Sequence, residues 1–174
     1  TVNGKKAYFF LSEEKPFLGR ALHVQIKEGD SKVSIEYTTS PTAEALLWVE
    51  KENELPFLFS QSQAILARTW IPCQDSPSVR FTYSADVTVP KELMALMSAE
   101  NPQVKSPDGK YHFEMKQRIP SYLLALAVGD VAFKSLSENT GVYATADMLD
   151  LAYNEFSDMP GMVKAAEDLY GPYA

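Results

Sequence analysis

Apolar and polar residues alternate one for one along much of this chain, and this two-residue period limits the fold more than any other feature. The clearest run extends from Val79 to Val89, where every second side chain is apolar. Shorter runs with the same period cover residues 22–27, 32–38 and 111–116. Residues two apart on a strand point to the same side, so each run predicts a strand with one buried face. Such strands are typical of antiparallel or mixed sheets, and the turn signals between them favour a mainly β, sandwich-like body.

The period changes to that of a helix after Thr145. Ser157 is a suitable helix N-cap, Pro160 is tolerated in a first turn, and Gly171-Pro172 is a stop signal. We also expect a shorter helix over roughly residues 147–156. The apolar residues of the second helix form one stripe, which consists of Met159, Met162, Val163, Ala166 and Leu169. These features predict a β domain over residues 1–145 and a short helical segment over 146–174 that begins another domain.

Composition excludes several classes of function. With 16 basic and 23 acidic residues the formal charge is −7, which argues against nucleic acid or a membrane surface as a partner. Cys73 is the only cysteine, so the chain forms no internal disulfide and no thiolate-rich metal site. A reducing, cytoplasmic compartment is therefore expected, with the periplasm as the alternative. The longest apolar run, Tyr122–Gly129, is too short for a membrane span of ~20 residues and predicts a buried strand.

No residue cluster indicates that this chain carries a complete catalytic site. His23 and His112 are the only histidines, and each lies on the polar face of an alternating run. No zinc-binding H-E-x-x-H, nucleophile-elbow or phosphate-loop motif occurs. Arg68 and Asp75 flank a proline-containing turn around Cys73, and a charge pair that shapes this turn is the better interpretation than a ligand site. The acidic residues Glu50, Glu52 and Glu54 are expected to form a solvated linker.

Two glutamines two residues apart, Gln61 and Gln63, stand out in the segment "FSQSQ". On a strand they share one face, with Ser60 and Ser62 on the other. One interpretation is an ordinary solvated face, and spacing alone favours it. The other is a pair of neutral acceptors that receive an ammonium group, because an amide oxygen accepts hydrogen bonds without adding a charge.

The order of several longer segments changes this weighting. The segments "TTSPTAEALLWVE", "FLFSQSQAILARTWIPCQDSPSVRFTYSADVTVPKELMALMSA", "RIPSYLLALAVGD" and "YNEFSDMPGMVKAAEDLYGPY" occur in this order. They closely resemble successive blocks of the aminopeptidase N-like zinc metallopeptidases (gluzincins), and most closely the leukotriene A hydrolase/aminopeptidase branch. The resemblance implies a saddle-shaped, β-rich N-terminal domain, present here in incomplete form, followed by the start of a thermolysin-like catalytic domain. It places zinc in the parent enzyme, on an H-E-x-x-H motif and a downstream glutamate that this sequence lacks.

The resemblance also implies a role for the two glutamines. The family's N-terminal domain supplies a Gln or Glu that binds the α-amino group of the substrate, and its place in the motif falls on Gln63. Gln61 matches a second polar residue that faces the same cleft. The expected partners are a peptide with a free N-terminus and the parent's own catalytic domain.

On this basis we expect the substrate-binding portion of a zinc aminopeptidase that releases N-terminal amino acids, with no catalytic residue, no metal and no activity of its own. We expect a parent that acts on peptides without the epoxide hydrolase activity of the closest branch. The alternative is a non-catalytic β-sandwich scaffold or binding module.

Overall fold

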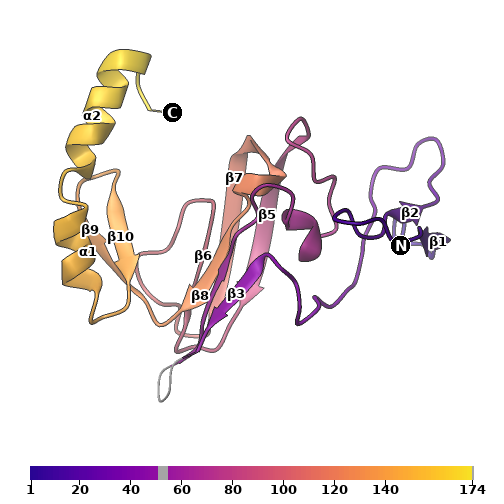
Figure 1. The fold of residues 1–174 in the computed structure, drawn as a ribbon, viewed down its shortest axis with the longest axis horizontal. Coiled ribbons are helices and arrows are strands. Elements are labelled where there is room, and N and C mark those ends of the chain that lie inside the picture. The colour runs from indigo at the N-terminus through magenta and orange to yellow at the C-terminus, as the bar shows by residue number, and fades with distance from the viewer. Residues whose placement is uncertain (51–54, 174) are drawn as a thin grey trace.

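The structure is a computed structural model that describes residues 1–50 and 55–173. Strands form the centre of the molecule, the segment before β3 extends from one side, and two helices lie on the opposite side (Figure 1). The mainly β fold expected from the alternating runs is confirmed, and the paired strands are antiparallel.

A four-stranded sheet lies at the centre. Its order is β3 (Leu46–Val49), β4 (Phe57–Ser60), β8 (Leu126–Gly129) and β6 (Met94–Met97). The two middle strands, β4 and β8, are therefore hydrogen-bonded on both edges. The backbone of β4 is consequently held by β3 on one side and by β8 on the other.

The longest strands form a separate two-stranded ribbon of β5 (Arg80–Thr88) and β7 (Lys110–Pro120). Exposed and half-buried residues alternate without exception along β5, as its sequence predicts. The apolar side of the ribbon packs on the core. The buried residues of this core are Ala43, Ala45, Trp70, Met94, Ala95, Met97, Tyr111, Phe113, Leu124 and Val131.

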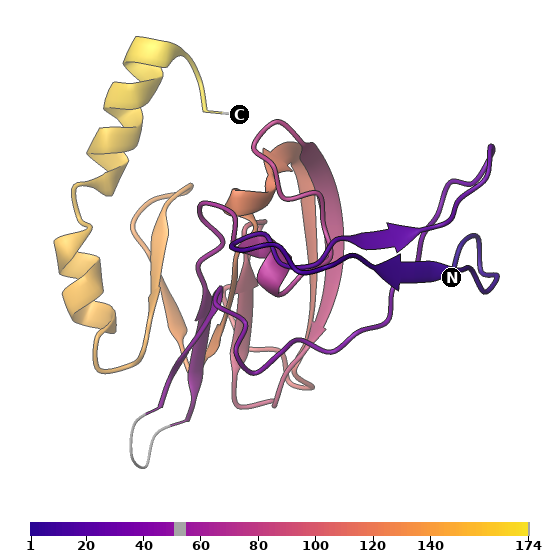
Figure 2. The same ribbon diagram turned by 45° about the vertical axis from the view of Figure 1, so that its right-hand side comes forward.

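Two small sheets flank this centre. β1 (Phe9–Leu11) pairs with β2 (Leu22–Val24) in the N-terminal segment, which projects away from the rest in Figure 2. β9 (Ala132–Ser135) pairs with β10 (Gly141–Ala144) and follows directly after β8.

The two helices are α1 (Leu149–Glu155) and α2 (Met159–Tyr170), close to the expected ranges. The N-cap of α2 is Asp158 and not Ser157, and its side chain makes no capping hydrogen bond, so that detail of the prediction was wrong. Pro160 lies in the first turn, and Gly171, with φ of 96°, ends the helix as expected.

Lys134 attaches α1 to the β9–β10 sheet. Its Nζ atom lies 2.7 Å from Asp150 Oδ1 and 4.2 Å from the centre of the Tyr153 ring. The ammonium group thus contacts side chains at both ends of one turn of α1. The helix and this small sheet therefore form one packed unit.

Three expected strands differ from the structure. Residues 32–38 form no strand, and only Val33 makes a bridge, to Val2. The run expected over 22–27 is a strand only as far as Val24. In the apolar run 122–129 the first residues belong to the 3₁₀ helix η2 (Ser121–Leu123), and the strand begins at Leu126.

For the expected acidic linker, Glu50 is exposed, whereas Glu52 and Glu54 lie outside the described residues. In the part of the chain that the structure describes, no helix has the length and apolar character needed to cross a membrane.

Candidate functional site

The glutamine segment begins where β4 ends. The strand stops at Ser60, so Gln61 and Gln63 lie just beyond it and not on a strand as expected. The alternation nevertheless continues: both glutamines are exposed, and Ser62 between them is only 2% exposed. The two carboxamides therefore project from the protein while the serine points inward.

Hydrogen bonds of the serines explain this arrangement. Ser60 Oγ accepts from the Leu126 backbone N–H at 2.8 Å, and Ser62 Oγ donates to the Leu124 carbonyl oxygen at 2.8 Å. The indole Nε1 of Trp70 donates to Ser62 Oγ at 3.2 Å. Because buried hydroxyl groups need partners, these bonds make an inward serine favourable at a position where a strand would ordinarily carry an apolar side chain.

The two glutamines differ in how their side chains are used. The Gln61 backbone N–H donates to the Ala45 carbonyl oxygen at 2.8 Å, and its side-chain Oε1 accepts from the Gln63 backbone N–H at 3.2 Å. Within the described ranges, no hydrogen bond occupies the carboxamide of Gln63. The Gln63–Ala64 peptide bond is cis. Gln63 thus presents a free acceptor and a free donor to solvent, whereas Gln61 already uses its oxygen locally.

The turn after this segment is closed by an ion pair, as its sequence suggested. Asp75 Oδ2 accepts from the backbone N–H and the Nε of Arg68, both at 3.1 Å, and Oδ1 accepts from Ser121 Oγ at 2.5 Å. The side chain of Asp75 is 2% exposed and that of Arg68 is 25% exposed. Burial raises the pKa of Asp75, but the hydrogen bonds from Ser121 and Arg68 outweigh it and leave the pKa below its ordinary value. The pair shapes the turn and leaves no carboxylate free for a ligand.

The cysteine and the histidines carry no catalytic arrangement. Burial, and next the negative charge of Asp75, raise the pKa of Cys73 to about 11 although Arg68 opposes this, so the thiol is protonated at neutral pH. His23 stacks on Phe10 with ring centres 4.5 Å apart, and His112 Nδ1 lies 2.7 Å from Asp86 Oδ1 on an exposed face. Over residues 1–50 and 55–173, no three His, Cys, Asp or Glu side chains gather in a way that could hold a metal ion. The described residues therefore do not fit zinc.

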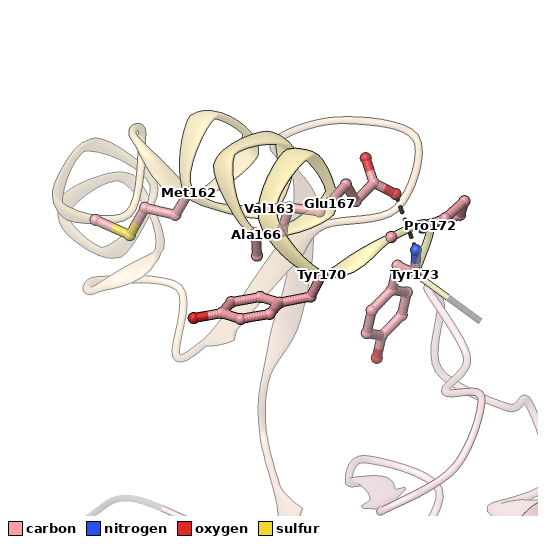
Figure 3. Close-up of a pocket in the computed structure, with 8 residues that line it drawn as sticks. Met162, Val163, Ala166, Glu167, Tyr170, Pro172 and Tyr173 are labelled. Carbon is pink, nitrogen blue, oxygen red and sulfur yellow. Dashed lines mark hydrogen bonds between the residues drawn. The ribbon is translucent and has the colours of Figure 1, made fainter.

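An apolar hollow of about 480 Å³ lies along α2 and the tail that follows it. Met162, Val163, Ala166 and Tyr170 line it, and Tyr173 faces it from the tail (Figure 3). The Tyr173 backbone N–H donates to Glu167 Oε1 at 3.2 Å, which holds the tail against the helix. The lining is suited to packing and not to chemistry. Met162 is 63% exposed and Leu169 74% exposed, so the predicted apolar stripe exists but is left uncovered.

Sequence reasoning placed Ser60 and Ser62 on the face opposite the glutamines but predicted neither their hydrogen bonds nor the contact with Trp70. A signal was present, because Leu58, Ser60 and Ser62 occupy the inward side of one strand and its extension. The change from an apolar to a hydroxyl side chain on an inward face indicates buried hydrogen bonds. Their partners, however, come from distant parts of the chain.

Comparisons with known proteins give consistent results. The family described as the Peptidase M1 N-terminal domain matches residues 1–123. Leukotriene A-4 hydrolase of Xenopus laevis is 41% identical over 99% of this chain, and aminopeptidase B of Rattus norvegicus is 40% identical over 68% of it. The solved structure of native leukotriene A4 hydrolase from Saccharomyces cerevisiae superposes on the whole chain with a TM-score of 0.83 at 28% identity. The chain covers 30%, 18% and 28% of these three proteins.

Proposed function

Since the chain belongs to the family of Peptidase M1 N-terminal domains, we propose that it is the substrate-recognising part of a zinc aminopeptidase that releases N-terminal amino acids from peptides. The relatives reported above are enzymes by name, which favours this function over a non-catalytic scaffold. The whole enzyme acts in the cytoplasm in this proposal, and the single cysteine of the chain is compatible with a reducing compartment.

The observation that carries the proposal is the free carboxamide of Gln63 on the exposed side of a tightly held segment. Its oxygen accepts a hydrogen bond from the α-ammonium group of a peptide. A neutral acceptor suits this task because it binds the cation without the strong attraction of a carboxylate, so the product amino acid can leave. Gln61 contributes its side-chain N–H donors and the second lone pair of Oε1 to the same surface.

The metal belongs to another part of the enzyme in this proposal. Among residues 1–50 and 55–173, no group of three His, Cys, Asp or Glu side chains could hold zinc, and the chain covers less than a third of the length of the relatives. We assign residues 1–145 to the N-terminal β domain and residues 146–174 to the start of the catalytic domain. The uncovered apolar side of α2 supports this boundary, since such a stripe ordinarily packs against another element.

Replacement of Gln63 in the full-length enzyme tests the proposal. A hydrogen bond to a charged group contributes about 1.5–3 kcal/mol, so Gln63→Ala should lower kcat/KM for an aminoacyl-anilide roughly 10- to 150-fold. Gln117→Ala is the matched control, because Gln117 is also an exposed glutamine but lies on β7. Equal kinetics for wild type and Gln63→Ala would remove this residue from the site.

A further inference from the structure

The hydrogen bonds of Ser60 and Ser62 follow the register of the sheet. β4 pairs with β8 with Leu58 opposite Val128 and Phe59 opposite Ala127. Each further step along β4 moves one residue back toward the start of β8, so Ser60 comes opposite Leu126 and Ser62 opposite Leu124. These are the two residues whose backbone groups the serine hydroxyls contact, both at 2.8 Å. The side chains thus continue the pairing after the strand itself has ended.

The opposite edge of the segment is held in the same way. β3 pairs with β4 with Leu46 opposite Ser60, so Ala45 comes opposite Gln61. The Gln61 backbone N–H does donate to the Ala45 carbonyl oxygen. With contacts on both edges, the chain stays extended through Ser62, and side chains continue to alternate inward and outward.

Trp70 determines which way the Ser62 hydroxyl points. The serine is 2% exposed and the tryptophan 8% exposed, so their contact is shielded from bulk solvent. The hydroxyl proton is directed to the Leu124 carbonyl oxygen, and the indole N–H is donated to one of the two lone pairs on Ser62 Oγ. The serine thereby gives the buried indole N–H an acceptor, whereas alanine would leave this N–H without a partner.

We propose that Ser60 and Ser62, with Trp70 behind them, are positioning residues that direct Gln63 toward the substrate's ammonium group. This inference depends on the proposed function of Gln63. The serines touch no substrate; they fix the backbone from which Gln63 projects. Loss of either hydroxyl allows the segment to depart from its extended conformation. The carboxamide oxygen then lies within hydrogen-bonding distance of the ammonium group for only part of the time.

Two inhibitors that differ only in the ammonium group separate positioning from general damage. Leucine hydroxamate carries the α-ammonium, and isocaprohydroxamic acid has the same skeleton without it. In the full-length enzyme, Ser62→Ala should raise the inhibition constant of leucine hydroxamate about tenfold and leave that of isocaprohydroxamic acid within about twofold. An equal increase in the inhibition constants of both inhibitors, or no increase in either, would overturn the inference.

Ser98→Ala is the matched control. Ser98 Oγ accepts from the Ala125 backbone N–H at 3.0 Å, between the two residues that the other serines contact. It approaches from the end of β6, and among the described residues its hydrogen bonds go to Ala125 and Tyr83 and not to the glutamine segment. Its loss should change both inhibition constants by less than about twofold. A loss specific to leucine hydroxamate in this variant as well would show that the strand as a whole, and not the serine contacts, is responsible.

A double-mutant cycle distinguishes this inference from the function on which it depends. If Ser62 acts through Gln63, adding Ser62→Ala to Gln63→Ala should not raise the inhibition constant of leucine hydroxamate any further. If Gln63→Ala alone has no effect, the proposed function fails. If Gln63→Ala has its effect and Ser62→Ala has none, only the positioning role fails.

Trp70→Phe provides an independent variant should Ser62→Ala not fold, because it keeps an aromatic ring in the core and removes the N–H donor together with the five-membered ring of the indole. It should raise the inhibition constant of leucine hydroxamate about threefold and leave that of isocaprohydroxamic acid unchanged. An equal effect on the two inhibitors, or none, would count against the inference.

Discussion

Removal of the Asp75 carboxylate gives the strongest test of how the turn after the glutamine segment is held. Its side chain is 2% exposed and accepts hydrogen bonds from Arg68 N, Arg68 Nε and Ser121 Oγ. Breaking a buried ion pair from one side costs about 3–5 kcal/mol, because the other charge stays behind without its partner. The Arg68 side chain is 25% exposed and water can reach it, so we expect Asp75→Ala to lower the free energy of unfolding by about 3 kcal/mol.

Urea unfolding at pH 7 measures this effect, with the fluorescence of buried Trp70 as the signal. Asp86→Ala is the control, since the Asp86 side chain is 89% exposed and its pair with His112 should contribute less than about 0.5 kcal/mol. A loss below about 1 kcal/mol for Asp75→Ala would refute the reasoning, because it would mean that the network does not hold the turn.

The same carboxylate predicts a dependence on pH. Its pKa is lowered in the folded protein, where the hydrogen bonds from Ser121 and Arg68 outweigh the opposing effect of burial. Its stabilisation is therefore fully present above the unfolded pKa of about 3.9 and is lost as the pH falls through the folded pKa. The difference in unfolding free energy between wild type and Asp75→Asn should shrink below about pH 4. A constant difference from neutral to strongly acidic pH would contradict this.

Two further predictions concern single residues. Gly109 has φ of 72°, and an added Cβ would lie 2.0 Å from the Val89 carbonyl oxygen, so Gly109→Ala should cost about 3 kcal/mol or more. Gly171→Ala, where φ is 96° but the space is open, should cost only about 1–2 kcal/mol; equal urea midpoints for the two variants would contradict this. Because the pKa of Cys73 is raised to about 11, its alkylation by iodoacetamide should keep accelerating about tenfold per pH unit beyond pH 9. A plateau between pH 8 and 9 would show an ordinary thiol.

The local sequence patterns correctly predicted strands where a second strand pairs with them in the structure. The run from Val79 to Val89 forms β5 because its apolar side covers the core and β7 pairs with it at both ends, with one register shift between Phe81 and Tyr83. Residues 32–38 have the same alternation, yet only Val33 makes a bridge. A strand requires hydrogen bonds to another strand, and a local period carries no information about that partner.

The helices show the same limit. The stripe that includes Met162 and Leu169 correctly predicted α2, but both side chains are largely exposed, since the described residues provide nothing that packs on them. The helix start was misplaced by one residue because Ser157 and Asp158 are both good capping residues in sequence.

For the candidate site, the shared side of Gln61 and Gln63 followed from their spacing, although the strand on which they were placed ends at Ser60. The contact of Ser62 with Leu124, 62 residues away in sequence, could not be predicted from any such spacing. Hydrogen bonds across such separations depend on the register of the assembled sheet, which no local pattern encodes. The role of Gln63 stays a prediction for the kinetic test above.

The attachment of α1 by Lys134 has a mechanical consequence. α1 packs on the β9–β10 sheet, and only Asp130 and Val131 separate this sheet from the end of β8. A rotation of the helices therefore pulls on β8, whose neighbour β4 leads directly into the segment of Gln61 and Gln63. Any change in how the helices pack reaches these two glutamines through only a few residues of chain and one pair of strands.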